Sequence, residues 1–597
     1  MITFIFLLFL FFTNPISPTS IPDRFTKSLS TSFPKHKSRE YFELSLPLPT
    51  DYLTPSCTLQ ILRHSFANTI NSPPFTTPYS PPSNCSLPWS HIVLEFRAKC
   101  KGEQYDRISG LWLGGVELLR TSTAQPTQCG IFWKVRKDVT RYYSVLLQSN
   151  LNLTMMLENI VNREYTGVYH VEVAFYYYKD VVVNNKNDGV SLPFIVGNKN
   201  SGGKLGLETE KFERNLGVGA EEPADLILPI SDTGDKGFWY RIESETAMRF
   251  KEIRIPKNTR RVVLEFYVSF HGNDEFWYSN PPNSYVTVNN ITTGRANGAY
   301  REVFVTVDGQ LAGSEVPFPV VFTGGINPLF WEPVVAIGAF NLPTYDLELT
   351  PFLGTLLDGK AHQIGIGVAD GISYWLVDAN LHLWLDHNSH SVEAKSKVNL
   401  NPVFRIERGS VFRQLDGSFK IKAERVCNSI GWVKWSAGNF TTTFLQSYKF
   451  NNLIRFQKNG TYKLVKQKVK ANRQVKFENQ VGQVIASRSV KRKYPLSVST
   501  ATLPGSRKNT YLLLTNVSHS MNEKYSNGGS KIHVHNSQDS VGWMEVRDHS
   551  VLSGKAKTKQ SFMYRDRLTC YSRSVNAGDG KLLSDNATFH CLDLFAL

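Results

Sequence analysis

Short runs in which apolar and polar residues alternate recur along the first part of the chain. A period of two is typical of a strand with one buried and one exposed face. We predict strands at 91–96, 111–118, 131–135, 151–157 and 168–177. Because no helical interval separates these runs, we predict one β-sandwich or jelly roll over residues 40–182. Its Pro/Ser-rich stretch at 71–86 is expected to be a long surface loop.

A second group of strand-like runs follows residue 220. They lie at 226–229, 247–255, 261–268, 284–288, 301–307, 334–338, 346–349, 362–368 and 374–386. Asp308-Gly309, directly after one of these runs, is a strong hairpin-turn signal. We therefore predict a second jelly roll over 221–397. A linker or long loop at 183–220, rich in Asn, Gly, Lys and Glu, is expected to join the two.

The length of the chain implies more than one hydrophobic core. A chain of 597 residues, of which 41% are hydrophobic and 12% aromatic, should form several domains. The composition shifts at about residue 398, and strand-like runs continue beyond it. We predict an all-β protein with two adjacent jelly-roll domains and a basic β-rich C-terminal domain at 398–597.

The positive charge is confined to the C-terminal part. Residues 401–597 hold 32 Lys and Arg against 12 Asp and Glu, a net of +20, whereas residues 1–400 hold 35 against 39, a net of −4. The domain is either a solvated β-domain that happens to be basic or a surface for an anionic partner. No nucleic-acid-binding motif is present, so an acidic cell-wall polysaccharide is a more sensible partner than nucleic acid. We predict that Lys491-Arg492-Lys493 is a solvated loop rather than a processing site.

The N-terminus predicts entry into the secretory pathway. Its apolar run, residues 2–12, has the length of a signal-peptide core and is too short to span a bilayer. We predict a signal peptide at 1–20, a flexible leader at 16–39, no membrane span, and an extracellular, cell-wall or vacuolar location. Seven glycosylation sequons fit this compartment: Asn84, Asn152, Asn290, Asn439, Asn459, Asn516 and Asn586.

Seven cysteines are divided between the two ends of the chain. They are Cys57, Cys85, Cys100, Cys129, Cys427, Cys570 and Cys591. In an oxidising compartment we expect disulfides within each end region and at least one remaining thiol. Their spacing fits no zinc site, and the chain has no phosphate-loop, zinc-protease or serine-hydrolase motif. We therefore expect no metal and no cofactor.

Asp106 is the first candidate for acid–base chemistry. It lies between Tyr105 and Arg107, directly after an alternating run. A carboxylate beside a cation and an aromatic ring is suited to proton transfer, and Arg107 favours its ionised form. The alternative is a surface ion pair at the end of a strand, which contributes little to stability.

The sequence around Asp106 resembles a known enzyme family. The runs YDRISGLWLGGVELLRTSTAQP (105–126) and WKVRKDVTRY (133–142) are similar to the signature of the plant and fungal peptide N-glycanase A family. The resemblance extends over residues 44–386, and the C-terminal portion resembles the plant members. The run 105–108 is also similar to the Trp-Asp-Arg-Tyr run of bacterial peptide N-glycosidase F, which contains the catalytic Asp of that two-jelly-roll enzyme.

The resemblance implies two further acidic site residues. It places Glu275, in the run HGNDEFWYSN, across a groove from Asp106, and it gives Glu158 a role in orienting the substrate or the catalytic Asp. Aromatic neighbours of Glu275 favour its protonated form. Asp274 is an alternative to Glu275, and Glu158 could equally be a plain sandwich-edge residue.

Sugar-binding side chains are expected to line the same groove. The aromatic candidates are Trp112, Phe276, Trp277, Tyr278, Phe330 and Trp331, and the others are Tyr105, Arg107 and His271. The implied activity is hydrolysis of the asparagine–N-acetylglucosamine amide, including glycans with core α1,3-fucose, to give Asp and a 1-amino glycan. The alternatives are a non-catalytic glycan-binding jelly-roll protein and, less favoured, a glycosidase.

Overall fold

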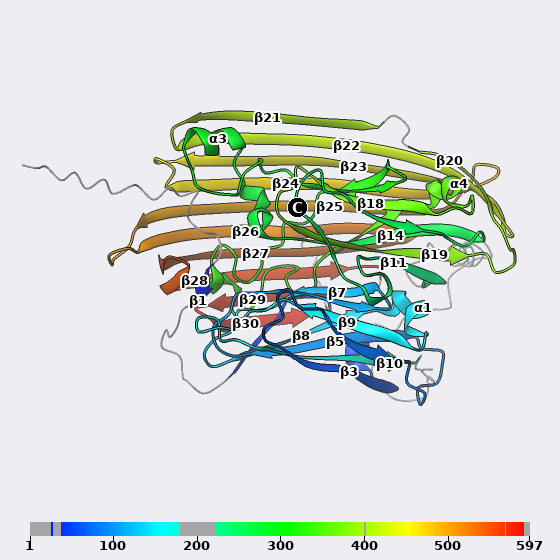
Figure 1. Ribbon diagram of the computed structural model, residues 1–597, viewed down its shortest axis with the longest axis horizontal. Coiled ribbons are helices and arrows are strands. Elements are labelled where there is room, and N and C mark those ends of the chain that lie inside the picture. Colours follow the sequence, from blue (N-terminus) through cyan, green and yellow to red (C-terminus); the bar gives the residue numbers. More distant parts are fainter. Residues whose placement is uncertain (1–24, 28–37, 180–221, 399–401, 568, 590–597) are drawn as a thin grey trace, which may run out of the picture.

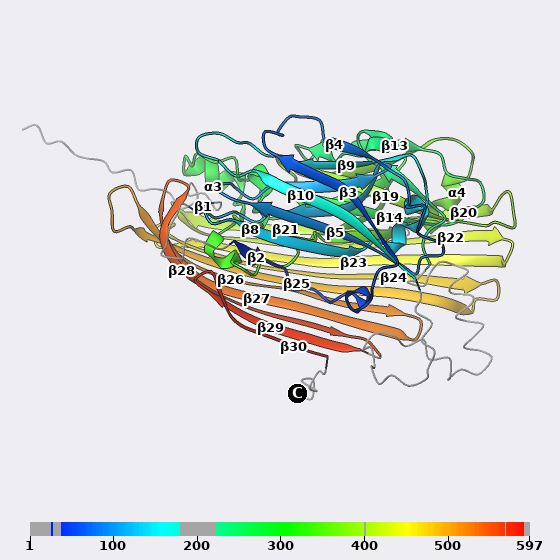
Figure 2. The same ribbon diagram turned by 90° about the horizontal axis from the view of Figure 1, so that it is seen from below.

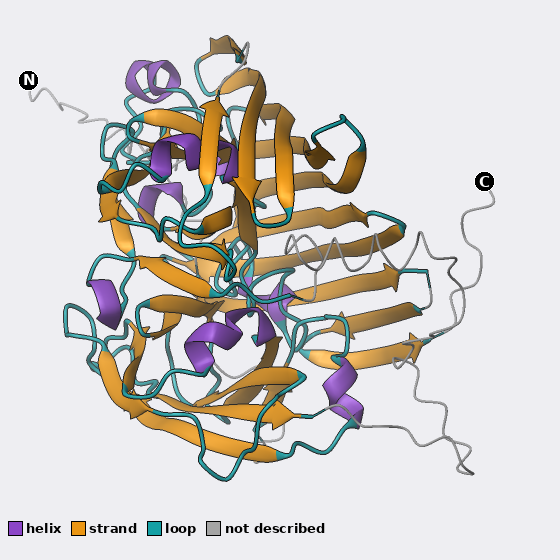
Figure 3. Ribbon diagram, turned by 90° about the vertical axis from the view of Figure 1, so that its right-hand side faces the viewer, coloured by secondary structure: helices purple, strands orange, loops and turns teal. Residues whose placement is uncertain are grey.

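The computed structural model describes residues 25–27, 38–179, 222–398, 402–567 and 569–589. Strands form five sheets in this part of the chain, and the helices are short (Figure 3). The α-helices are α1 (Tyr143–Leu146), α3 (Asn283–Val288) and α4 (Leu353–Leu356). None of the described helices is long and apolar enough to cross a bilayer. The all-β prediction is confirmed, whereas the predicted signal peptide (1–20) and linker (183–220) lie outside the described residues.

Two sheets form the first sandwich. The five-stranded sheet has the order β2 (Arg39–Tyr41), β8 (Ile131–Asp138), β5 (His91–Cys100), β10 (Tyr169–Tyr178), β3 (Cys57–Phe66). The four-stranded sheet has the order β4 (Phe75–Tyr79), β9 (Leu151–Leu157), β6 (Ile108–Leu113), β7 (Val116–Ser122). Two predictions need correction here. The expected loop at 71–86 contains edge strand β4, and the expected strand at 111–118 is a hairpin that turns at Gly114-Gly115, where both φ angles are positive.

The second sandwich also has two sheets. The first has the order β11 (Leu226–Ile230), β19 (Trp375–Leu385), β14 (Thr259–Phe270), β17 (Thr344–Glu348), with β12 (Tyr240–Ile242) also on β19. The second has the order β13 (Arg249–Ile253), β18 (His362–Ala369), β15 (Glu302–Val307), β16 (Gln310–Glu315). The predicted hairpin at Asp308-Gly309 is confirmed, since it joins β15 to β16 with φ angles of 49° and 77°.

Two strand predictions in the second sandwich are wrong. Residues 284–288 lie in helix α3, which places the Tyr285 ring against Phe412, Phe419 and Phe456. Residues 334–338 form no strand, and Val334 makes only an isolated bridge. In both places burial against another part of the molecule, rather than membership of a sheet, explains the apolar residues.

A single sheet of twelve strands covers both sandwiches. Its main order is β20 (Glu393–Lys397), β22 (Asp416–Trp435), β23 (Gly438–Gln457), β24 (Tyr462–Asn479), β25 (Val484–Pro504), β26 (Tyr511–Asn527), β27 (Ser530–Arg547), β28 (Ser550–Arg565), β29 (Cys570–Gly578), β30 (Lys581–Thr588). Strand β21 (Val403–Arg413) pairs with β22, and β1 (Thr26–Lys27) pairs with β28. The sheet lies behind the sandwiches in Figure 1 and beneath them in Figure 2. Because β20 belongs to it, the large sheet begins before residue 398.

Buried ion pairs join the large sheet to the second sandwich. Arg425 lies 2.6 Å from Glu302, while Arg473 and Arg492 lie 2.7 and 3.0 Å from Glu315. Arg492 belongs to β25, so the predicted loop at 491–493 is wrong. Strand alternation turns the two lysines outward and the arginine inward. The large sheet is therefore attached to the second sandwich by arginines on its inner face that pair with glutamates of the sandwich.

The cysteines are disulfide-bonded in the N-terminal region and near the C-terminus. Cys57 and Cys85 form a disulfide, which ties β3 to the loop that precedes β5. Cys570 is also disulfide-bonded. Cys100, Cys129 and Cys427 are free thiols. These findings agree with the expected disulfides and leftover thiols.

The two sandwiches meet across a buried polar interface. Arg120 donates two hydrogen bonds to Glu117, at 2.8 and 2.7 Å, and a third to the Leu376 carbonyl at 2.6 Å. Asp378 accepts a hydrogen bond from Trp112 Nε1 at 2.6 Å. Burial and the adjacent Glu117 charge raise the pKa of Asp378 well above its usual range. The folded protein therefore favours the protonated form of Asp378.

This proton makes stability depend on pH. An unfolded Asp loses its proton near its usual pKa, whereas folding raises the pKa of Asp378, so the free energy of unfolding should fall as pH rises above the unfolded pKa. Asp378→Asn retains an acceptor for Trp112 but has no proton to release. We expect its free energy of unfolding, measured in urea, to fall less than that of the wild type between about pH 5 and pH 9. A parallel decline in both proteins would contradict the assignment.

Candidate functional site

The candidate Asp106 lies in a loop between β5 and β6. The side chain of Gln104 holds this loop, because its Nε2 donates to the Ile160 carbonyl at 2.8 Å and its Oε1 accepts from Arg107 Nη2 at 2.6 Å. Tyr169 donates to the Tyr105 carbonyl at 2.9 Å. Asp106 itself is only 4% exposed. The first sandwich therefore supplies a rigid, nearly buried carboxyl group.

A glycine-containing loop of the second sandwich, residues 321–327, packs directly on Asp106. A Cβ atom at Gly324 would overlap Asp106 Oδ1 and the side-chain nitrogen of Gln125. Only glycine allows the backbone to approach so closely. Gly325 accepts a hydrogen bond from Trp331 Nε1 at 2.9 Å, which fixes the other side of the loop.

The same loop also contacts the segment that carries Glu275. That segment, residues 272–280, follows β14, and Glu275 is 5% exposed within it. A Cβ atom at Gly325 would lie 3.0 Å from the ring of Phe276, the next residue after Glu275. Asp106 and the Glu275 segment thus contact one loop at the neighbouring residues Gly324 and Gly325, although 169 positions separate the two carboxyl groups in the numbering.

Asp274 has a structural environment that distinguishes it from Glu275. Its carboxylate accepts two hydrogen bonds from Arg301, at 2.8 and 2.7 Å, and others from Trp375 Nε1, Asn280 Nδ2 and the Ile372 amide at 2.7, 3.2 and 2.9 Å. Both Asp274 and Arg301 are fully buried. With five donors around it, this carboxylate fixes the loop that presents Glu275.

Glu158 lies at the end of β9 beside two arginines. Burial raises the pKa of Glu158, and the charges of Arg241 and Arg107 act in the opposite direction. The Arg241 guanidinium lies 3.8 Å from the centre of the Tyr374 ring. Tyr374 in turn stacks on His271 with ring centres 5.3 Å apart. Two residues that the sequence analysis missed, Arg241 and Tyr374, therefore connect Glu158 with His271. Arg107 lies on the same side of the site as Glu158, because its charge acts on that carboxyl group.

Arg241 and Tyr374 had no distinguishing sequence signal. Arg241 lies in the three-residue strand β12, and Tyr374 directly precedes β19. Hydrogen bonds between the backbones of His271 and Tyr374, at 2.9 and 3.2 Å, bring these segments together. Arg241, Tyr374 and His271 therefore come together only because segments that are distant in sequence pair in the fold.

The aromatic residues predicted to bind sugar are mostly buried. Trp112 and Trp277 are 0% exposed and Trp331 is 1% exposed, and Phe276, Tyr278 and Phe330 are no more than 1% exposed. Trp277 stacks on Phe450 of the large sheet, with ring centres 6.3 Å apart. These rings pack in the core and present no face to a ligand in this structure. Tyr105 and Tyr374 are partly exposed.

The arrangement combines groups suited to proton transfer. Two nearly buried carboxyl groups, Asp106 and Glu275, lie around one loop, and Glu158 lies with Arg107 and Arg241 nearby. Such a set can activate water, hold a polar substrate and protonate a leaving group. The described residues contain no group of three or more His, Cys, Asp or Glu side chains that could hold a metal ion.

Two family models match the sequence. The model described as peptide N-acetyl-β-D-glucosaminyl asparaginase amidase A matches residues 46–402, and a PNGase_A C-terminal domain matches residues 418–496. Peptide-N4-(N-acetyl-β-glucosaminyl)asparagine amidase A of Prunus dulcis is 41% identical over 555 residues, which are 92% of this chain and 93% of that protein.

Solved structures show only a distant similarity. PNGase F, described as a glycosylasparaginase from Flavobacterium meningosepticum, has a TM-score of 0.32 and 12% identity over 55% of this chain and 96% of its own. PNGF-II also has a TM-score of 0.32 and 12% identity, over 55% of this chain and 66% of its own. Scores this low carry no argument about the site. The family model spans more than half of the sequence and the almond relative matches nearly all of it, and on these grounds the chain belongs to the peptide N-acetyl-β-D-glucosaminyl asparaginase amidase A family.

Proposed function

We propose that this protein is an amidase that cleaves the bond between asparagine and N-acetylglucosamine in N-glycopeptides and glycoproteins, releasing the whole glycan. The observation that carries this proposal is that Asp106 and the segment of Glu275 contact the same loop, residues 321–327, at neighbouring glycines. Family membership and the 41% identity to the Prunus dulcis amidase support the same reaction.

The proposed reaction is a hydrolysis assisted by two carboxyl groups. Asp106 accepts a proton from water as the water oxygen attacks the side-chain amide carbon of the glycosylated Asn. The carbon–nitrogen bond breaks, and Glu275 protonates the departing nitrogen. The peptide keeps an Asp, and the glycan leaves as a 1-amino sugar that later loses ammonia. Glu158, Arg107 and Arg241 hold the polar substrate.

The products distinguish this reaction from that of a glycosidase. Hydrolysis of the amide converts Asn to Asp, so the peptide product should carry no sugar and should be about one mass unit heavier than the same peptide with an unglycosylated Asn. In ¹⁸O water the difference should be about three mass units. Mass spectrometry of a single purified glycopeptide checks both values. A peptide that retains one N-acetylglucosamine would overturn the amidase assignment and indicate a glycosidase.

The substrate range and the compartment are proposed on narrower grounds. The family resemblance supports acceptance of glycans whose innermost N-acetylglucosamine carries α1,3-linked fucose, and two glycopeptides that differ only in this fucose would test it.

The apolar N-terminal run supports secretion to the extracellular space, cell wall or vacuole. All seven sequon asparagines are exposed or partly exposed, as glycosylation requires.

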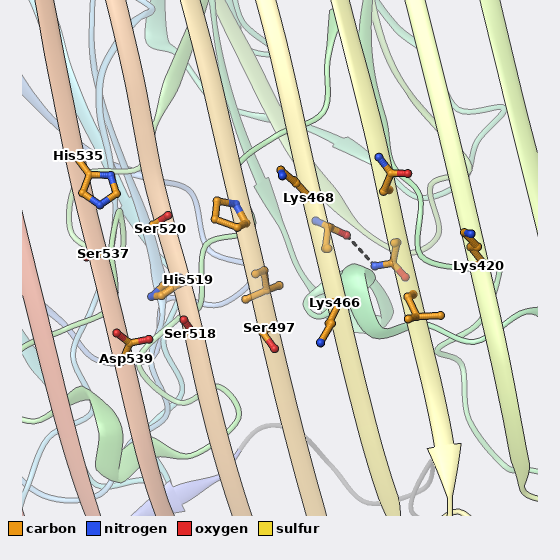
Figure 4. Close-up of a pocket in the computed structure, with 16 residues that line it drawn as sticks. Lys420, Lys466, Lys468, Ser497, Ser518, His519, Ser520, His535, Ser537 and Asp539 are labelled. Atoms are coloured by element: carbon orange, nitrogen blue, oxygen red, sulfur yellow. Dashed lines mark hydrogen bonds between the residues drawn. The ribbon is translucent and has the colours of Figure 1, made fainter. Parts of the chain in front are cut away.

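We also propose that the outer face of the large sheet binds an acidic cell-wall polysaccharide. A groove of about 610 Å³ crosses strands β22 to β27, and all of its lining residues belong to this sheet (Figure 4). Lys466 and Lys468 point to the face opposite buried Gln467. The polar side chains labelled in Figure 4 include three lysines, two histidines and one aspartate.

A row of lysines borders this groove. Lys449 pairs directly with Lys470, and Lys470 pairs directly with Lys493, so three cations lie on neighbouring strands about 4.8 Å apart. Like charges in direct opposition destabilise a sheet. Lys449 lies 3.8 Å from Glu424, whereas in the part of the chain that is described no carboxylate lies within ion-pair distance of Lys470 or Lys493. Such a row suits a polyanion with regularly repeated carboxylates.

Neutralising the row should weaken polysaccharide binding. The triple variant Lys449→Gln, Lys470→Gln, Lys493→Gln is expected to bind polygalacturonate about tenfold more weakly than wild type. Wild-type binding should also weaken with added salt, because exposed charges are screened over about 8 Å at physiological ionic strength.

Three exposed lysines of the second sandwich provide a matched control, since Lys236→Gln, Lys257→Gln, Lys360→Gln removes the same charge elsewhere. Equal losses in the two triple variants would show that only net charge matters and would overturn the surface. Wild-type protein that binds anionic lipid vesicles but not polygalacturonate would also overturn the proposal. Co-sedimentation measures both ligands.

A further inference from the structure

A short N-terminal segment, residues 25–27, is docked into the body of the protein. Its strand β1 pairs in parallel with β28, with Thr26 opposite Ser550, and the Thr26 amide donates to the His549 carbonyl at 2.9 Å. The sequence analysis predicted a flexible leader at 16–39. That prediction is wrong for residues 25–27, because they add a strand to the edge of β28.

The side chain of Phe25 anchors this segment. It is 1% exposed and packs in a small cluster with Tyr511, Leu513, Met544, Val546 and Val551 of the large sheet. Burial of an aromatic side chain of this size stabilises the docked segment. The segment is therefore held by apolar packing as well as by backbone pairing.

The backbone of Phe25 connects two parts of the candidate site. Its amide donates to the Gly324 carbonyl at 3.1 Å, and its carbonyl accepts from Gln125 Nε2 at 2.6 Å. Gly324 is the residue whose backbone packs on Asp106, and Gln125 borders the same contact. The backbone of this one residue thus joins the first sandwich to the loop at 321–327.

Lys27, at the other end of the segment, contacts Glu332 and Tyr41. Its Nζ lies 2.7 Å from Glu332 and donates to Tyr41 Oη at 3.3 Å. The Lys27 and Glu332 side chains are 12% and 9% exposed, so the pair is largely desolvated. Glu332 follows Trp331, whose indole hydrogen bonds to Gly325. Both ends of the segment therefore act on the loop that covers Asp106.

We propose that residues 25–27 form a positioning strap for the loop at 321–327, in which Phe25 holds Gly324 against Asp106. The effect on catalysis rests on the proposed amidase function. The strap touches no substrate. It acts by restricting the loop, and a shift of the loop by about 1 Å would misplace Asp106 relative to the water and the amide.

The test compares two full-length variants with equally buried sites. Phe25→Ala removes the anchor of the strap, whereas Leu44→Ala removes a side chain that is also 1% exposed but packs in a separate cluster with Val334, Phe562 and Tyr571. Both variants should lower the melting temperature, because each opens a cavity. Only Phe25→Ala should lower kcat, by about 10- to 100-fold, with little change in KM. Phe25→Leu should retain most of the activity.

Hydrogen exchange supplies a readout that is independent of activity. Amides at 321–327 should exchange faster in Phe25→Ala than in wild type or Leu44→Ala. Equal exchange and equal kcat in the two alanine variants would overturn the strap. Wild-type protein that cleaves no glycopeptide would contradict the proposed function instead, and the exchange comparison would then decide whether the strap exists.

Discussion

Asp106→Asn is expected to lower kcat for glycopeptide hydrolysis by about 10³-fold, with the fold and glycopeptide affinity near those of the wild type. The amide is almost the same size as the carboxylate, so it can occupy the space left by Gly324. It cannot accept a proton from water at neutral pH. Single-turnover kinetics, isothermal titration calorimetry and thermal melting would separate the loss of turnover from losses of binding or stability.

An exposed aspartate provides the control for this variant. Asp232→Asn changes the same charge on the surface of the second sandwich and should leave kcat unchanged. A folded Asp106→Asn protein that keeps more than about a tenth of wild-type kcat would exclude Asp106 as the general base. Glu158, which lies beside Arg107 and Arg241, would then be the next residue to test.

Replacement of the two neighbouring acids, Asp274 and Glu275, should have opposite consequences. Asp274→Asn leaves the buried Arg301 guanidinium without its carboxylate partner, and we expect a loss of about 3–5 kcal/mol in the free energy of unfolding. Glu275→Gln should change that free energy by only about 1 kcal/mol but lower kcat by at least about 10²-fold, because an amide cannot donate a proton as an acid does.

Urea denaturation and steady-state kinetics on the same two preparations check this contrast. If Glu275→Gln keeps wild-type kcat while Asp274→Asn is stable but inactive, the roles of the two residues are reversed. Asp548→Asn, at the exposed turn between β27 and β28, is a suitable control because Asn also adopts the positive φ that this position has. It should change neither quantity substantially.

The period-two pattern was sufficient to predict most strands of the two sandwiches. It worked where one face of a strand packs on a core and the other meets solvent, as in β8. It failed at 284–288, where Tyr285 needs burial against the large sheet and a short helix provides it. It also did not indicate that residues after 398 would join one sheet across both sandwiches, because pairing between strands leaves no local signal.

The sequence alone determined the fold class and the family, because these depend on local pattern and on a contiguous motif, and it made Asp106 the first candidate for catalysis. Tertiary structure decided the rest of the site. Asp274 and Glu275 are neighbours in sequence, and only the position of Arg301 shows which of them is committed to a buried ion pair. Likewise, only folding brings Phe25 and Gly324 to Asp106, since hydrogen bonds and close packing depend on distance in space rather than on separation along the chain.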